Sequence, residues 1–205
     1  MSRVRGKKTG KKIQNVSQER DRYQTPPWAV TPLLPYIEHL PAVWEPAAGD
    51  GLLAGELKRV GHHVIASELL RGQNFFTWHP AREWDVLVTN PPFSIKADWM
   101  ARCYRLQRPF ALLMSLDCLG TAEMQGVMKG QELEVIFLDK RINYIVDGVV
   151  QNGVPFASCW FTSGLGIGRE MTFASVPEPY PLGQMALFDE PETFAQPSLL
   201  LEMEI

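Results

Sequence analysis

The sequence has few of the features that mark secreted, zinc-binding or membrane proteins. Its three cysteines, Cys103, Cys118 and Cys159, are odd in number and show no C-x-x-C spacing. This pattern argues against both a disulfide framework and a zinc ribbon. No stretch approaches the about 18 apolar residues of a membrane-spanning helix, and no apolar segment follows the basic N-terminus as in a signal peptide. We therefore expect a cytoplasmic protein without a membrane partner.

Charges of opposite sign are separated at the two ends of the chain. Residues 1–22 hold eight basic and two acidic side chains, whereas residues 170–205 hold seven acidic and no basic ones. A basic arm can bind a polyanion such as DNA by counterion release, although a solvated, disordered tail has the same charge pattern. The distribution predicts a flexible basic arm at 1–22, a globular domain at 23–169, and an acidic, proline-rich tail at 170–205.

The domain has the composition and patterning of an α/β protein. Hydrophobic residues make up 45% of the 205 residues and charged residues 21%, which is close to the average for globular domains. Short apolar runs alternate with segments of helical spacing at 52–60 and 98–107, and this alternation predicts a mostly parallel sheet with helices on both faces. The late apolar runs, joined by a turn near Asp147-Gly148 or Asn152-Gly153, predict an antiparallel strand at the C-terminal end. The expected strands are 42–44, 63–67, 85–89, 110–116, 133–138 and 154–161.

Two acidic positions and a glycine loop follow the first two expected strands. Residues 45–51, Glu-Pro-Ala-Ala-Gly-Asp-Gly, come directly after the first strand, and Glu68 comes directly after the second. In parallel sheets, ligands bind at the carboxyl ends of the strands. Glycine lets backbone N–H groups approach a ligand closely, and an acid at this place accepts hydrogen bonds from ribose hydroxyls. The pattern predicts a nucleoside ligand.

A third motif, Asn90-Pro91-Pro92-Phe93, follows the expected strand at 85–89. Proline has no N–H, so the two prolines leave carbonyl acceptors without adding donors. An asparagine oxygen and a proline carbonyl together suit an amino group with two N–H donors. Phe93 offers a flat surface on which a base can stack. A proline-rich turn after a strand is the structural alternative.

These motifs resemble those of S-adenosylmethionine-dependent methyltransferases that modify adenine N6, in the gamma order of motifs. The resemblance covers residues 21–165 and is closest to small phage and prophage-type enzymes that act on DNA. It implies a Rossmann-like class I methyltransferase fold, with S-adenosyl-L-methionine as cofactor and no metal. It also implies that the protein works in the cytoplasm of a bacterial or phage-infected cell. It implies catalytic roles for Asn90, Pro91, Pro92 and Phe93. It implies cofactor binding by Tyr23, Thr25, Glu45, Pro46, Ala47, Gly49, Asp50, Glu68, Asn74 and Phe75.

The resemblance also implies a mechanism in which the adenine is flipped out of its stack into the pocket. Asn90 and the Pro91 carbonyl accept hydrogen bonds from N6, which then attacks the methyl group directly. The same tetrapeptide suits RNA adenine, cytosine N4 and glutamine amide groups, since all present a planar amino group. A catalytically silent nucleic-acid or replisome adaptor on the same fold is a further alternative. Arg141 and Tyr144 are weaker candidates for the target side of the pocket.

The acidic tail holds one short apolar motif, Gln184-Met185-Ala186-Leu187-Phe188. It resembles the Gln-x-x-Leu-Phe peptide by which bacterial replication proteins bind the sliding clamp, with Gln184, Leu187 and Phe188 as contacts. The alternative is that these side chains cover an edge of the core. Enzymes that this chain resembles usually carry a target-recognition domain after the catalytic core, and the tail is too short for one. Either sequence specificity is low, or the substrate is recognised through the basic arm, a partner, or the loops within 94–132 and 142–153. If the motif binds a clamp, this tether could replace the missing domain by concentrating the enzyme on DNA.

Overall fold

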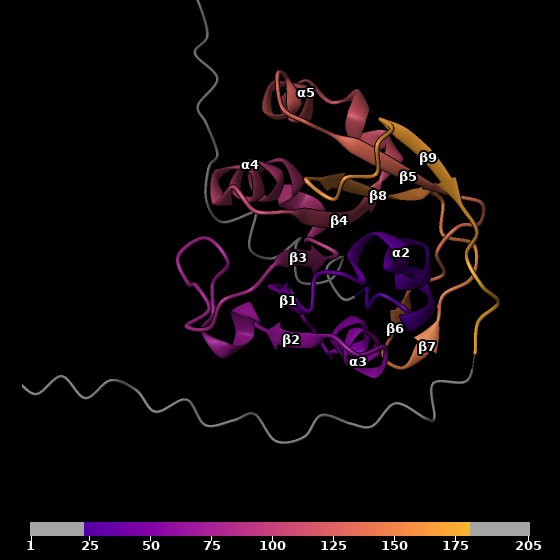
Figure 1. Ribbon diagram of the computed structural model, residues 1–205. Coiled ribbons are helices and arrows are strands. Elements are labelled where there is room, and N and C mark those ends of the chain that lie inside the picture. Colours follow the sequence, from indigo (N-terminus) through magenta and orange to yellow (C-terminus); the bar gives the residue numbers. More distant parts are fainter. Residues whose placement is uncertain (1–22, 181–205) are drawn as a thin grey trace, which may run out of the picture.

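The computed structural model describes residues 23–180, which form a seven-stranded sheet with helices on both faces (Figure 1). The expected basic arm and the motif with Gln184, Leu187 and Phe188 lie outside the described residues. In spatial order the strands are β2 (His63–Ala66), β1 (Ala42–Glu45), β3 (Val86–Thr89), β4 (Phe110–Ser115), β8 (Ser158–Ser163), β5 (Glu134–Leu138) and β9 (Met171–Ala174).

Strand direction matches the prediction from the sequence. β2, β1, β3 and β4 run parallel, and β8 lies antiparallel between β4 and β5, with Ser115 opposite Ser158 in the register. The expected Rossmann-like sheet of the class I methyltransferase type, with a late antiparallel strand, is confirmed. β8 begins at Ser158 rather than at the expected residue 154, because Pro155 has no N–H to give to a strand ladder.

The two faces of the sheet carry different helices. α4 (Lys96–Leu106) and α5 (Ala122–Met128) cover one face, and α2 (Leu34–Ile37) and α3 (Leu52–Arg59) cover the other, together with the 3-10 helix η1 (Pro27–Leu33) (Figure 1). Side chains alternate between the faces along a strand, so Val86 and Val88 pack on the α3 side and Leu87 packs on the α4 side. Trp160 Nε1 donates to the Ala29 carbonyl at 2.9 Å, which fixes η1 on the sheet.

The remaining elements are short and connect the strands at the edges of the sheet. β6 (Ile145–Val146) and β7 (Val149–Val150) form a hairpin whose turn, Asp147-Gly148, has φ angles of 50° and 76°. Of the two turn positions expected from the sequence, Asp147-Gly148 is the one that closes this hairpin. The other elements are the 3-10 helices η2 (Leu69–Arg71), η3 (Phe93–Ile95) and η4 (Leu116–Gly120).

The folded part of the chain extends past residue 169, where the sequence analysis placed the start of the tail. β9 pairs in parallel with β5, and Tyr180 packs edge-on against Trp28 with ring centroids 5.7 Å apart. Phe173 remains 80% exposed. Because β9 buries little of its side chains, its sequence does not stand out as a strand from the proline-rich residues around it.

Candidate active site

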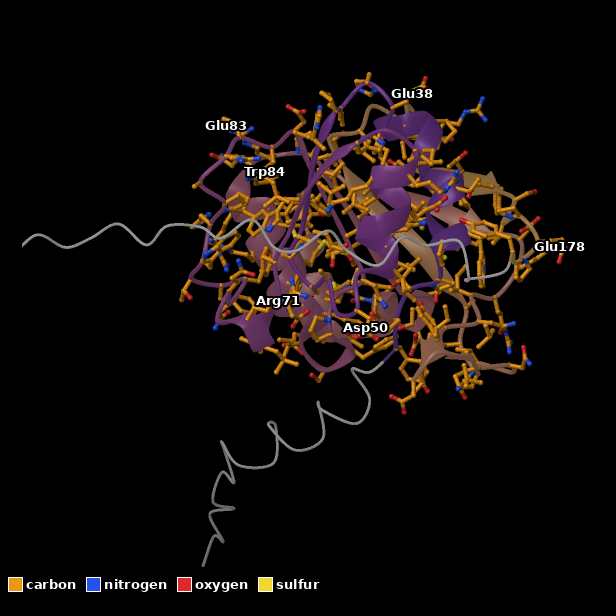
Figure 2. The ribbon with its side chains drawn as sticks, turned by 90° about the horizontal axis from the view of Figure 1, so that it is seen from below. Glu38, Asp50, Arg71, Glu83, Trp84 and Glu178 are labelled. Atoms are coloured by element: carbon orange, nitrogen blue, oxygen red, sulfur yellow. The ribbon has the colours of Figure 1, made fainter. Side chains whose placement is uncertain are left out.

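The carboxyl ends of the parallel strands meet at one edge of the molecule. The loops after β1, β2 and β3 all leave from this edge, which is where ligands bind in sheets of this type. Figure 2 shows Asp50 and Arg71, which follow β1 and β2, near one another, and Glu38 and Glu83, which precede β1 and β3, away from them. Asp50, an expected site residue, thus lies at the carboxyl edge, away from Glu38 and Glu83.

The glycine loop at 46–51 is held by one contact to Glu68 and another to Gln24. The Gly49 N–H donates to Glu68 Oε2 at 2.8 Å, and the Asp50 N–H donates to Gln24 Oε1 at 3.0 Å. Gly49 has a φ of 51°, and a Cβ there would lie 2.5 Å from Gln24 Oε1, so only glycine fits without displacing that side chain. The structure thus brings Glu68 into contact with the loop that holds Gly49 and Asp50. Gln24 lies between Tyr23 and Thr25, to which the resemblance assigns cofactor binding, but it had no signal of its own.

Glu45, at the end of β1, is a buried carboxyl group with spare acceptor capacity. It is 2% exposed, and the Ala54 N–H donates to it, while its Oε2 has no hydrogen-bond partner among residues 23–180. Burial, together with the nearby charge of Glu68, raises the pKa of Glu45 to about 8. Glu45 is therefore largely protonated at neutral pH when the site holds no cation.

This raised pKa predicts how stability depends on pH. The folded chain keeps a proton that the unfolded chain releases from pH 4.5 upward. The contribution of Glu45 to stability is therefore fully present below pH 4.5 and is lost as pH rises through about 8. We expect Glu45→Gln to remove a slope of up to about 1.4 kcal/mol per pH unit. Thermal unfolding of both proteins from pH 5 to 9 measures it, with the exposed Glu123→Gln as control. Parallel curves for wild type and Glu45→Gln would contradict the prediction.

The tetrapeptide after β3 places a buried acceptor beside the glycine loop. Asn90 continues the alternation of Val86 and Val88 and so lies on the same side of the sheet as α3. Its Oδ1 is buried and accepts no hydrogen bond from residues 23–180. Pro91 is buried and Pro92 half-buried, and neither has an N–H that could satisfy this oxygen. An unpartnered buried oxygen of this kind points to a donor from a ligand.

Phe93 lies within a group of aromatic rings rather than alone. Its ring centroid is 6.0 Å from that of Tyr23, 6.2 Å from Tyr144 and 5.2 Å from Phe156. Tyr144 is fully buried, and its hydroxyl group pairs with Ser158 Oγ at 2.8 Å. Tyr23, which is expected to bind the cofactor, therefore contacts Phe93 of the tetrapeptide. Arg141 donates instead to the Val154 carbonyl, at 3.1 Å.

Asn74 and Phe75, which the resemblance assigns to the cofactor, make contacts within the fold. Asn74 Oδ1 accepts the Phe76 N–H at 2.9 Å, so this amide closes a local turn. Phe75 is 3% exposed and stacks on Trp99 with ring centroids 4.0 Å apart. Its ring belongs to the core under α4. Of the other expected residues, Thr25 and Pro46 are buried and Ala47 is half-buried beside the loop.

One hollow of the described surface lies away from this edge. It has a volume of about 430 Å³ and lies near the amino ends of β1 and β2, lined by His62, His63, Arg82 and Glu83 among others. The unpartnered oxygens of Glu45 and Asn90 lie instead at the carboxyl edge, which is why we place the site there. In residues 23–180, no three His, Cys, Asp or Glu side chains gather as a metal ligand set. No helix in this part of the chain is long and apolar enough to cross a membrane.

Comparison with known proteins gives little further information. No profile of a known protein family matches the chain, and no curated protein matches its sequence. Among solved structures, a predicted O-methyltransferase from Agrobacterium tumefaciens matches with a TM-score of 0.39 and 14% identity, over 71% of this chain and 84% of that one. This similarity is too low to assign a family or an activity.

Proposed function

We propose that this protein transfers a methyl group from S-adenosyl-L-methionine to the N6 amino group of adenine in DNA. The observation that carries the proposal is the buried, unpartnered Oδ1 of Asn90 at the carboxyl end of β3. It stands beside the Pro91 carbonyl and the ring of Phe93, in the motif order that resembles adenine methyltransferases. An acceptor of this kind suits an exocyclic amino group.

The residues of the glycine loop fit the proposed cofactor. Glu68 accepts one hydrogen bond, from the Gly49 N–H. A carboxylate can accept further hydrogen bonds from donors such as ribose hydroxyls. The unpartnered Oε2 of Glu45 suits a cationic group, because an adjacent positive charge favours the ionised carboxylate. When bound, S-adenosyl-L-methionine supplies an electrophilic methyl group on a sulfonium ion. Glu45, Glu68 and the loop hold that cofactor.

The chain contributes positioning on the substrate side. Asn90 Oδ1 and the Pro91 carbonyl accept hydrogen bonds from the amino group and hold its nitrogen toward the cofactor site. Phe93 stacks on the base, within the ring group that includes Tyr23 and Tyr144. Orientation of two bound reactants lowers the barrier by removing translational and rotational freedom.

The decisive experiment is incubation of the full chain with S-adenosyl-L-methionine carrying a labelled methyl group, and with unmethylated DNA or RNA. Mass spectrometry of the digested nucleosides identifies the product. N6-methyladenine in DNA supports the proposal, whereas label in RNA, in cytosine N4 or in a protein glutamine identifies an alternative substrate. Nucleic-acid binding without any transfer would instead favour the adaptor function.

We further propose that the motif at 184–188 binds a bacterial sliding clamp and so concentrates the enzyme on newly made DNA. The support for this is the sequence alone, in which Gln184, Leu187 and Phe188 match the clamp-binding pattern. A peptide covering 180–192 is expected to bind the clamp, and Leu187→Ala with Phe188→Ala to abolish that binding. Methylation of free oligonucleotides should not change. No binding of peptide or intact protein at high micromolar clamp would exclude the interaction.

A further inference from the structure

Lys96 holds its ammonium group against the proposed target pocket. Its Nζ lies 4.2 Å from the centroid of the Phe93 ring and donates to Ser115 Oγ. Ser115 is the last residue of β4, is 4% exposed, and lies opposite Ser158, which holds the Tyr144 hydroxyl group. The ammonium therefore covers one face of the ring on which the base is proposed to stack.

This is an unfavourable position for a lysine. Lys96 is the first residue of α4, and a helix N-terminus carries partial positive charge, which favours acidic side chains. Burial lowers the pKa of Lys96, although Cys118 and Asp117 lie close enough to oppose the shift. An ammonium group has three N–H donors. Within residues 23–180, the hydrogen-bond acceptor that meets it is Ser115 Oγ.

The side chains around the pocket form a complementary set of acceptors and donors. Asn90 Oδ1 and the Pro91 carbonyl are acceptors, and Lys96 Nζ is a donor that lies over the ring of Phe93 in the same motif. The amino group of adenine is flanked on both sides by ring nitrogens, N1 and N7, which are acceptors. The protein acceptors match the amino group of adenine, and the protein donor matches the ring nitrogen next to that amino group. Thymine has no amino group and does not match these acceptors.

We propose that Lys96 is a specificity-determining residue that donates a hydrogen bond from Nζ to the ring nitrogen next to the reactive amino group, N1 or N7 of adenine. This inference rests on the proposed function and deepens it. The flexible four-carbon stem of lysine lets Nζ leave the Phe93 ring when the base enters, while α4 keeps its place. In the free protein, the Phe93 ring and Ser115 hold the ammonium near its site of action.

The test uses single-stranded DNA of random sequence, so that no target sequence need be known. In one substrate every adenine is replaced by 7-deazaadenine, and in another by 1-deazaadenine, which removes N7 or N1 as an acceptor. For the wild-type chain, one of the two replacements is expected to lower kcat/KM by about 10- to 100-fold, the effect of losing a hydrogen bond to a charged group. Lys96→Met is expected to have a kcat/KM lower than that of wild type by a similar factor on unmodified DNA. Replacing adenine by the analogue that slows wild type should lower the kcat/KM of Lys96→Met little further.

Three measurements separate this role from a structural one. Lys96→Met should keep the wild-type thermal midpoint and affinity for the cofactor, and Lys96→Arg, which keeps the charge, should recover part of the activity. Lys129→Met, at the end of α5, is the matched control and should behave as wild type. The inference is overturned if Lys96→Met methylates unmodified DNA as fast as wild type does. It is also overturned if both analogues slow methylation by Lys96→Met as much as they slow methylation by wild type. Failure of the proposed function itself is recognised separately, because the wild-type chain would then methylate no nucleic acid.

Discussion

Asn90→Ala is expected to reduce methyl transfer by at least about 100-fold, the loss typical when a preorganised contact to the reacting atoms is removed. Its Oδ1 has no partner within residues 23–180, so the substitution breaks no hydrogen bond of this oxygen. Removing a buried acceptor without stranding a donor costs little stability. We therefore expect an unchanged thermal midpoint and unchanged cofactor affinity, with the loss confined to kcat. Single-turnover transfer from labelled cofactor measures it.

The conservative variant Asn90→Asp sharpens this test. A carboxylate also accepts hydrogen bonds from an amino group, so Asn90→Asp should retain more activity than Asn90→Ala. Gln125→Ala, an exposed amide on α5, serves as the matched control. Wild-type turnover by Asn90→Ala would exclude amino-group methylation through this motif. A general loss of stability in Asn90→Ala would instead assign the side chain to the fold.

The strands that build the site were predictable because they are buried on both faces. β1, β3 and β4 are short apolar runs, as central strands of parallel sheets are. α5 had no such signal, since it has only seven residues and one of them, Met124, is buried. The predicted motifs followed from the same logic, because polar residues just after a buried strand must lie at the carboxyl edge.

The surroundings of the motifs were not predictable, because they depend on contacts between distant parts of the chain. Tyr144 reaches Phe93 only because the β6–β7 hairpin is joined to the N-terminal segment by paired backbone hydrogen bonds between Gln24 and Ile145. Lys96 lies just before the helix expected at 98–107 and had no signal of its own in the sequence. The local contacts of two motif residues were also not predictable, because Asn74 closes a turn and Phe75 packs in the core.

Glu68→Ala is expected to weaken binding of S-adenosyl-L-methionine more than any other substitution in the glycine-loop region. It removes the proposed contact to the ribose and the acceptor for the Gly49 N–H, so the loop loses its tie to β2. Loss of one hydrogen bond to a charged group costs about 1.5–3 kcal/mol, which corresponds to about 10- to 150-fold in affinity. Calorimetric titration of the full chain measures the change.

Two further variants identify the cause of that loss. Glu68→Gln keeps an acceptor for Gly49 but removes the charge, so its affinity should lie between those of wild type and Glu68→Ala. The charge of Glu68 helps to raise the pKa of Glu45. In Glu68→Gln, the contribution of Glu45 to stability should therefore be lost at a lower pH than in wild type. Glu38→Ala, at the opposite edge of the molecule, is the control and should bind as wild type does (Figure 2). Equal affinities for wild type and Glu68→Ala would remove Glu68 from the cofactor site, and the buried carboxyl of Glu45 would then have to be explained without a bound cation.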